Sequence, residues 1–180
     1  MNIMKKLMPV LLFVILSLGL NAQNFSIRGG VNLASLSGDD VVDTDNVTGY
    51  YVGPAFDLNL GVVNLDIALL YGRRGGKFSS TQSSVKLDYI DLPVLLKFNL
   101  GPIILEAGPY AAMLLNASNG GIDVGDMVDN ADFGLMAIGG VALGDLVFEL
   151  TYTKGLSDVW KDELINLKNG SFSFGLRYCF

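Results

Sequence analysis

The segment from Lys86 to Leu115, KLDYIDLPVLLKFNLGPIILEAGPYAAMLL, decides the fold. Apolar residues occupy every second position in two long runs, Asp88 to Asn99 and Ile103 to Met113, which Leu100-Gly101-Pro102 separates. A period of two indicates a β-strand, and a Gly-Pro pair between two such runs indicates a turn. The segment therefore predicts two long antiparallel strands joined by a short turn.

The same alternation recurs on both sides of this segment. Six further strands are predicted at Phe25 to Leu33, Tyr50 to Leu60, Val63 to Gly72, Phe133 to Leu143, Leu146 to Thr153 and Phe172 to Phe180. Short turns, such as Gly61-Val62 and Gly144-Asp145, alternate with long polar connections: Leu36 to Gly49, Arg73 to Ser84, Asn116 to Ala131 and Leu156 to Asn169. Short turns at one end and long loops at the other are typical of outer-membrane barrels. We therefore predict an all-β fold, an eight-stranded antiparallel up-and-down transmembrane β-barrel.

The two faces of the predicted strands carry different side chains. One face holds Phe, Tyr, Leu, Ile and Val with almost no charge, over lengths of about ten residues that suffice to cross hydrocarbon. In lipid every backbone amide needs a partner within the protein, so the sheet must close, and side chains can fill an eight-stranded barrel. We therefore expect a structural charge network in the lumen, formed by the charged residues of the other face: Arg28, Asp57, Asp66, Asp91, Lys97, Glu106, Glu149 and Arg177. A soluble lipocalin-like barrel, the structural alternative, would direct such charges outward.

Three prolines fall inside predicted strands, at Pro54, Pro93 and Pro109. Proline cannot donate a hydrogen bond to a strand ladder, and a closed barrel offers no edge strand where this would be harmless. We expect bulges or strand bends near these residues.

Composition excludes several classes of function. The 180 residues include 17% charged residues and have a formal net charge of -6, so no basic face for nucleic acid is evident. With no histidine and one cysteine, the chain has no Ser-His-Asp triad, no histidine metal site and no disulfide framework. We expect no catalytic residue, no metal and no cofactor, and an enzyme in this barrel would need an unusual carboxylate-serine site.

The first 22 residues resemble a secretory signal peptide. Lys5 and Lys6 precede an apolar stretch from Leu7 to Leu20, and Ala22 supplies a small residue for cleavage. This stretch is short for a membrane-spanning helix, which needs about 20 apolar residues. We predict a signal peptide at residues 1–22, a barrel domain at residues 23–180 and export to the outer membrane.

Several motifs resemble those of the PorT-like outer-membrane β-barrel proteins of the Bacteroidetes. They are YIDLPVLLKF at 89–98, EAGPY at 106–110, DFGL at 132–135, YTKGL at 152–156 and the ending FGLRYCF at 174–180. The resemblance implies an outer-membrane barrel of a Gram-negative cell, and its named member is similar to components of secretion and gliding. It supplies no catalytic residues, and Thr151 stands where many such sequences carry an arginine.

The C-terminal aromatic residues Phe174, Tyr178 and Phe180 look like the signal that the outer-membrane assembly machinery recognises. They also fit an aromatic girdle at the periplasmic interface, and both roles are compatible.

Two of the predicted long loops are acidic, through Asp39, Asp40, Asp43, Asp45, Asp123, Asp126 and Asp129. Their spacing does not match a calcium loop, which leaves solvated charge or weak bridging by divalent cations. The second loop is basic, through Arg73, Arg74 and Lys77, and can pair with the acidic loops or with anionic outer-leaflet lipid.

Function is predicted only as a class. The first hypothesis is a structural or accessory outer-membrane barrel that serves envelope integrity, adhesion or a secretion complex, with membrane lipid and the assembly machinery as partners. The alternative is a small transporter or binder of an apolar ligand, reached through the lumen or a lateral opening.

Overall fold

The computed structural model describes residues 25–37, 44–61, 63–78, 83–119, 122–123, 131–157 and 168–180. The predicted signal peptide lies outside these residues, as do Asp39, Asp40, Asp43, Asp126 and Asp129 of the predicted acidic loops. Within the described ranges, no helix has the length and apolar character needed to cross a membrane.

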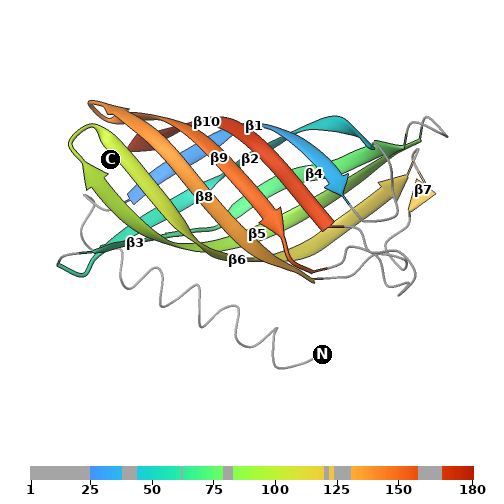
Figure 1. The fold of residues 1–180 in the computed structure, drawn as a ribbon, viewed down its shortest axis with the longest axis horizontal. Coiled ribbons are helices and arrows are strands. Elements are labelled where there is room, and N and C mark those ends of the chain that lie inside the picture. The colour runs from blue at the N-terminus through green and yellow to red at the C-terminus, as the bar shows by residue number, and fades with distance from the viewer. Residues whose placement is uncertain are drawn as a thin grey trace.

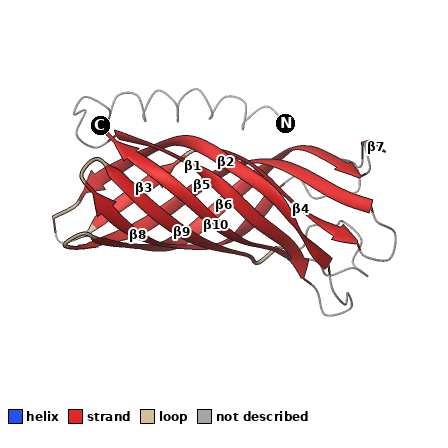
Figure 2. Ribbon diagram, turned by 90° about the horizontal axis from the view of Figure 1, so that it is seen from above, coloured by secondary structure: helices blue, strands red, loops and turns tan. Residues whose placement is uncertain are grey.

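The described residues form one closed sheet of antiparallel strands that tilt around a common axis (Figures 1 and 2). The strands are β1 (Phe25–Ser37), β2 (Thr44–Asn59), β3 (Asn64–Ala68), β4 (Leu70–Phe78), β5 (Ser83–Leu100), β6 (Ile103–Asn119), β7 (Ile122–Asp123), β8 (Ala131–Leu143), β9 (Leu146–Gly155) and β10 (Lys168–Cys179). Both β3 and β4 pair with β2 on one side and β5 on the other, so they are two parts of one barrel strand.

Closure comes from the first and last strands of the sheet. β1 pairs with β10 over a continuous register from Ser26↔Cys179 to Ser37↔Lys168. The short β7 pairs only with the end of β6, so the wall itself has eight strands. The predicted fold class, an eight-stranded antiparallel barrel, is confirmed.

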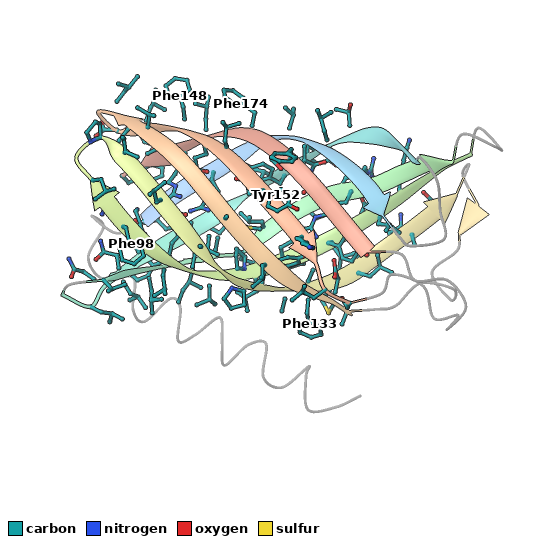
Figure 3. All side chains as sticks on the ribbon, viewed as in Figure 1. Phe98, Phe133, Phe148, Tyr152 and Phe174 are labelled. Carbon is teal, nitrogen blue, oxygen red and sulfur yellow. The ribbon has the colours of Figure 1, made fainter. Side chains whose placement is uncertain are left out.

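Side chains alternate between the lumen and the outer surface along most of each strand, and the alternation shifts at the bulge between Asp88 and Tyr89, where Leu87, Asp88 and Tyr89 are all buried. Along β9 every second residue is buried, and the residues between them are exposed. Phe172 and Leu150 are 63% and 62% exposed, whereas Arg28 and Arg177 are 1% and 0% exposed. Figure 3 shows Phe148 and other labelled aromatic side chains on the outside of the wall. Charges inside and apolar side chains outside are the reverse of a soluble barrel, which suits a barrel surrounded by lipid.

The outward residues of β5 give the height of the apolar band on the outer surface. The outward positions of β5 are apolar from Ile90 to Leu100, and toward the long loops they are followed by Asp88, which is 6% exposed and pairs with Arg73, and by the exposed Lys86. About ten steps of roughly 3.3 Å, tilted by about 40°, span about 25 Å along the barrel axis. This is the height of the lipid-facing band in outer-membrane barrels, so Asp88 and Lys86 lie at one membrane boundary.

Several strands continue beyond their predicted ends at the long-loop end of the barrel. β4 runs to Phe78 and β5 begins at Ser83, so most of the predicted loop from Arg73 to Ser84 is strand. β6 likewise extends to Asn119. The apolar alternation ends at the membrane boundary. Backbone hydrogen bonds between adjacent strands do not depend on that alternation, so the strands continue beyond the boundary into water.

The ladder is interrupted near prolines. Leu69 separates β3 from β4, and its N–H donates to the carbonyl of Pro54 at 3.0 Å. The β5–β6 ladder lacks two pairs around Pro109, between Pro93↔Tyr110 and Leu96↔Ala107, but keeps its register there, and its one shift of register lies at Asp88/Tyr89, away from the prolines. The predicted single strand from Val63 to Gly72 is therefore wrong in one respect, since a break at Leu69 divides it.

Candidate functional site

The candidate site is the barrel lumen, where charged side chains from most strands meet in two groups. The group nearer the short turns is called here the seven-charge cluster and contains Arg28, Asp57, Asp66, Lys97, Glu106, Glu149 and Arg177. Alternation with period two places these side chains inside, and barrel closure brings them together from strands far apart in the sequence.

Arg177 on β10 is the centre of the seven-charge cluster. Its guanidinium donates to Glu106 at 2.6 Å, to Glu149 at 2.5 Å and to Asp66 at 3.2 Å. All four side chains are at most 1% exposed. Arginine is suited to this position because its planar fork presents five donors, and unpaired carboxylates in the lumen would be costly.

Two further cations complete this cluster. Arg28 on β1 donates to Asp66 at 2.7 Å and reaches Glu106 at 3.5 Å. Lys97 on β5 donates to Asp57 at 2.6 Å, and its Nζ lies 3.9 Å from Glu106. The cluster therefore connects β1, β2, β3, β5, β6, β9 and β10 across the lumen.

A second group, called here the Arg74 cluster, lies nearer the long loops and contains Arg74, Asp91, Asp132, Tyr89 and Tyr110. Arg74 donates to Asp91, and its Nη1 lies 3.7 Å from Asp132. Its guanidinium also lies over the rings of Tyr89 and Tyr110, at 5.5 and 5.2 Å from their centroids. These cation–π contacts add to the ion pairs in compensating the buried charge.

Ser157 lies beside this cluster and fastens the end of β9 to β8. Its hydroxyl donates to Asp132 Oδ1 at 2.7 Å and accepts from the N–H of Phe133 at 2.8 Å. The N–H groups of Leu156 and Ser157 also donate to the carbonyl of Phe133. Ser157 therefore connects the end of β9 to β8. The carboxylate of Asp132 also accepts a hydrogen bond from the Tyr110 hydroxyl, at 3.2 Å.

Tyrosine rings and glycines fill much of the remaining lumen. A Cβ added to Gly175 would lie 2.1 Å from the hydroxyl of Tyr51, and one added to Gly134 would lie 2.5 Å from the ring of Tyr110. Only glycine leaves room for these rings against the wall.

A small cavity lies between the two clusters. It has a volume of about 20 Å³ and is lined mainly by polar residues, among them Asn32, Thr151 and Ser173. Arg28 and Tyr51 also line it, and Arg28 Nε and the Tyr51 hydroxyl have no hydrogen-bond partner among the described residues. A cavity of this size holds about one water molecule.

A larger hollow, of about 410 Å³, lies on the outer surface. Small residues form its floor, namely Ala107, Ala137 and Gly139, and apolar residues that include Leu105 and Tyr152 border it. A Cβ added to Gly139 would meet nothing within 4 Å. Because this part of the wall faces lipid, the hollow is suited to an acyl chain.

The eight charged residues that the sequence predicted for the lumen fall into two separate clusters. Seven of the eight meet in the seven-charge cluster, whereas Asp91 belongs to the Arg74 cluster. The expectation that Arg74 lies in a basic loop is wrong, because Arg74 points into the lumen and is 4% exposed. Continuing the alternation by two residues beyond Gly72 would have identified it, and the same signal from Gly134 would have identified Asp132.

The terminal aromatic residues lie on the outer surface, Tyr178 and Phe180 at the short-turn end and Phe174 midway along β10, in register with Leu150 of β9. Phe174, Tyr178 and Phe180 are all exposed. The rings of Tyr178 and Phe180 meet edge to face at 4.9 Å, and Phe25 lies 5.5 Å from Phe180. No group of three potential metal ligands occurs among the described residues.

The chain matches one family model, described as an outer membrane protein beta-barrel domain, over residues 20–161. Among solved structures, Neisserial surface protein A has a TM-score of 0.64 at 17% identity, covering 87% of this chain and 97% of that chain. The attachment invasion locus protein Ail of Yersinia pestis has a TM-score of 0.53 at 16% identity, covering 88% and 99%.

The outer membrane enzyme PagL is also similar in structure, with a TM-score of 0.50 at 12% identity over 86% of this chain and 99% of that chain. At such identities these likenesses show the fold alone. Comparison with curated proteins found no match.

Proposed function

The chain belongs to the family of outer membrane protein beta-barrel domains, and from this premise we propose that it is a non-conducting barrel with a structural or accessory role in the outer membrane. The observation that carries the proposal is the closed lumen. The seven-charge cluster and the Arg74 cluster lie across it, and the cavity between them measures about 20 Å³. A barrel of this kind can hold long loops at the cell surface without passing solutes.

The accessory role includes envelope integrity, adhesion or membership of a secretion complex. The last of these is supported by the motif resemblance to PorT-like proteins of the Bacteroidetes, as in the YIDLPVLLKF stretch at 89–98. The signal peptide at residues 1–22 would deliver the chain, and Phe174, Tyr178 and Phe180 would be recognised by the assembly machinery during insertion.

We further propose that the protein is not an enzyme, although PagL shows that this fold can carry enzymatic activity. The absence of histidine from the sequence supports this. Ser157 and Asp132 are the nearest approach to a catalytic pair, and their contacts with Phe133 fit a structural role better.

Planar-bilayer recording tests the closed lumen. The wild-type protein should show no large steady conductance after insertion. A matched variant, Arg28→Gly with Arg177→Gly, removes two long side chains from the seven-charge cluster and should conduct if it folds. A steady wild-type conductance of porin size would contradict the proposal. Insertion itself is checked by fractionation with outer membrane and by altered electrophoretic mobility on heating.

A second candidate, a binder of an apolar ligand, is favoured by the outward hollow at Ala107, Ala137 and Gly139. Its occupant would be a fatty acyl chain, since the hollow opens toward lipid. Gly139→Phe places a ring at a position where an added Cβ would meet nothing within 4 Å, and it should abolish binding of a spin-labelled fatty acid in the hollow. Unchanged binding of that probe to Gly139→Phe would exclude this site.

A further inference from the structure

The outward-facing cations whose side chains the structure describes are all at one end of the barrel. Among the residues whose side chains are described, those that carry a positive charge and point outward are Arg73 on β4, Lys86 on β5 and Lys154 on β9. Each lies in the long-loop half of its barrel strand. The described cations nearer the short turns, Arg28, Lys97 and Arg177, are buried in the lumen.

The strongest concentration of outward positive charge is formed by Arg73 and Lys86. Arg73 pairs in register with Asp88, and Lys86 lies two residues further along the same face of β5. Such diagonal positions on adjacent strands are within reach of long side chains. With Asp88 between them, the three groups carry a net charge of about +1.

Arg73 is held in place from two sides. Its Nε and Nη2 donate to the two carboxylate oxygens of Asp88 at 2.6 and 3.0 Å. Its guanidinium also lies 5.7 Å from the centroid of the Tyr50 ring, which in turn lies 6.1 Å from the ring of Tyr71. The bidentate pair uses two of the five donors of the guanidinium, and the side chain keeps 34% of its surface exposed.

The depth of this group agrees with the headgroup region of a membrane. Asp88 and Lys86 follow directly on the apolar band that begins at Ile90 and spans about 25 Å. Tyr50 and Tyr71 supply the aromatic residues that barrels place at such a boundary. Their outward direction brings Arg73 and Lys86 against lipid rather than against solutes in the lumen.

We propose that Arg73 and Lys86, with the ring of Tyr50 beneath the guanidinium, form a binding site for the phosphate group of an anionic lipid in the leaflet next to the long loops. Asp88 positions the guanidinium, and the remaining donors of Arg73 and the ammonium of Lys86 bind the phosphate oxygens. Guanidinium and ammonium groups are the side chains that recognise phosphate. This inference rests on the proposed placement in the outer membrane.

The test uses the full barrel refolded into phosphatidylcholine vesicles that contain lipid A with or without its phosphate groups. Binding of labelled lipid A is measured for the wild type and for Arg73→Gln with Lys86→Gln. Two basic residues near an anionic surface contribute enough for a loss of roughly tenfold or more in affinity. The loss should occur for phosphorylated lipid A only and should diminish at high salt.

Two single variants serve as matched controls. Lys154→Gln removes an outward cation on β9 that has no arginine beside it among the described residues, and should weaken binding at most about fivefold. Asp145→Asn changes the exposed turn at the opposite end and should have no effect. If the double variant fails to fold, the affinities for the two forms of lipid A are compared between the wild type and the single variant Lys86→Gln, which changes an exposed residue.

Equal affinity of wild type and double variant, or equal binding of both lipid A forms, would overturn the phosphate site. Those outcomes leave the proposed function intact provided that the barrel inserts and its mobility changes on heating. Failure to insert into any vesicle would instead contradict the membrane placement itself.

Discussion

The two ends of the lumen are stabilised differently. In the seven-charge cluster, Arg177 contacts three carboxylates at 2.5 to 3.2 Å, and charged groups do nearly all the pairing. In the Arg74 cluster, one guanidinium lies between two carboxylates and over two tyrosine rings. In the cluster near the long loops, the rings of two tyrosines therefore compensate part of the buried positive charge, which carboxylates alone compensate in the seven-charge cluster.

Each cluster has one more carboxylate than it has cations. The seven-charge cluster has Arg28, Lys97 and Arg177 against four carboxylates, and the Arg74 cluster has one cation against two. Removing a cation should therefore be much more harmful than neutralising a carboxylate, because it leaves several negative charges in a space closed to solvent.

Arg177→Met should have the largest effect. It leaves Glu106, Glu149 and Asp66 without their shared donor, and loss of one partner from a buried ion pair costs about 3–5 kcal/mol. Urea unfolding in detergent micelles, followed by the mobility shift on heating, measures the change. Lys154→Met, on the exposed surface, is the control and should change stability by less than about 0.5 kcal/mol.

Arg74→Met should have the next largest effect, at the lower end of about 3–5 kcal/mol, since it isolates fewer carboxylates than the first change. The variant Arg74→Met with Asp132→Asn should recover part of the loss by removing one unpaired charge. Stability equal to that of Arg177→Met in the same unfolding assay would contradict the proposed difference between the clusters.

Gly175→Val tests how tightly the lumen is filled between the clusters. A Cβ at Gly175 would lie 2.1 Å from the Tyr51 hydroxyl, so we expect a loss of about 1–3 kcal/mol from overpacking. Tyr51→Leu removes the clashing atoms, so Gly175→Val should cost less in that background. A double-mutant cycle of the four proteins measures this coupling, and additive losses would argue against the contact.

Asp57→Asn should have the smallest effect. The Asp57 side chain keeps 25% of its surface exposed and pairs with Lys97 at the margin of the seven-charge cluster. Partly exposed ion pairs contribute about 1 kcal/mol or less, and the cluster already has an excess of carboxylates. A loss above about 2 kcal/mol in the unfolding assay would show that this margin is as important as the centre.

The architecture could be predicted from local pattern, because burial by lipid imposes the same period of two on every strand. The faces assigned to Arg28, Glu106 and Arg177 followed from that period alone. The predicted loop from Arg73 to Ser84 included Arg74, and the predicted strand from Phe133 began one residue after Asp132, because the apolar outward pattern ends at the membrane boundary, whereas the lumen-facing pattern continues past it.

By itself, the sequence determined an eight-stranded barrel with charges inside, since strand length and alternation are local properties that lipid selects. Only the tertiary structure decided which charges meet, as when β10 brings Arg177 to Asp66 of β3, 111 positions away in the chain. Barrel closure and strand tilt set those partners. They also separated Asp91 from the other predicted lumen charges, whereas the opposite directions of the adjacent residues Arg73 and Arg74 follow from the period of two alone.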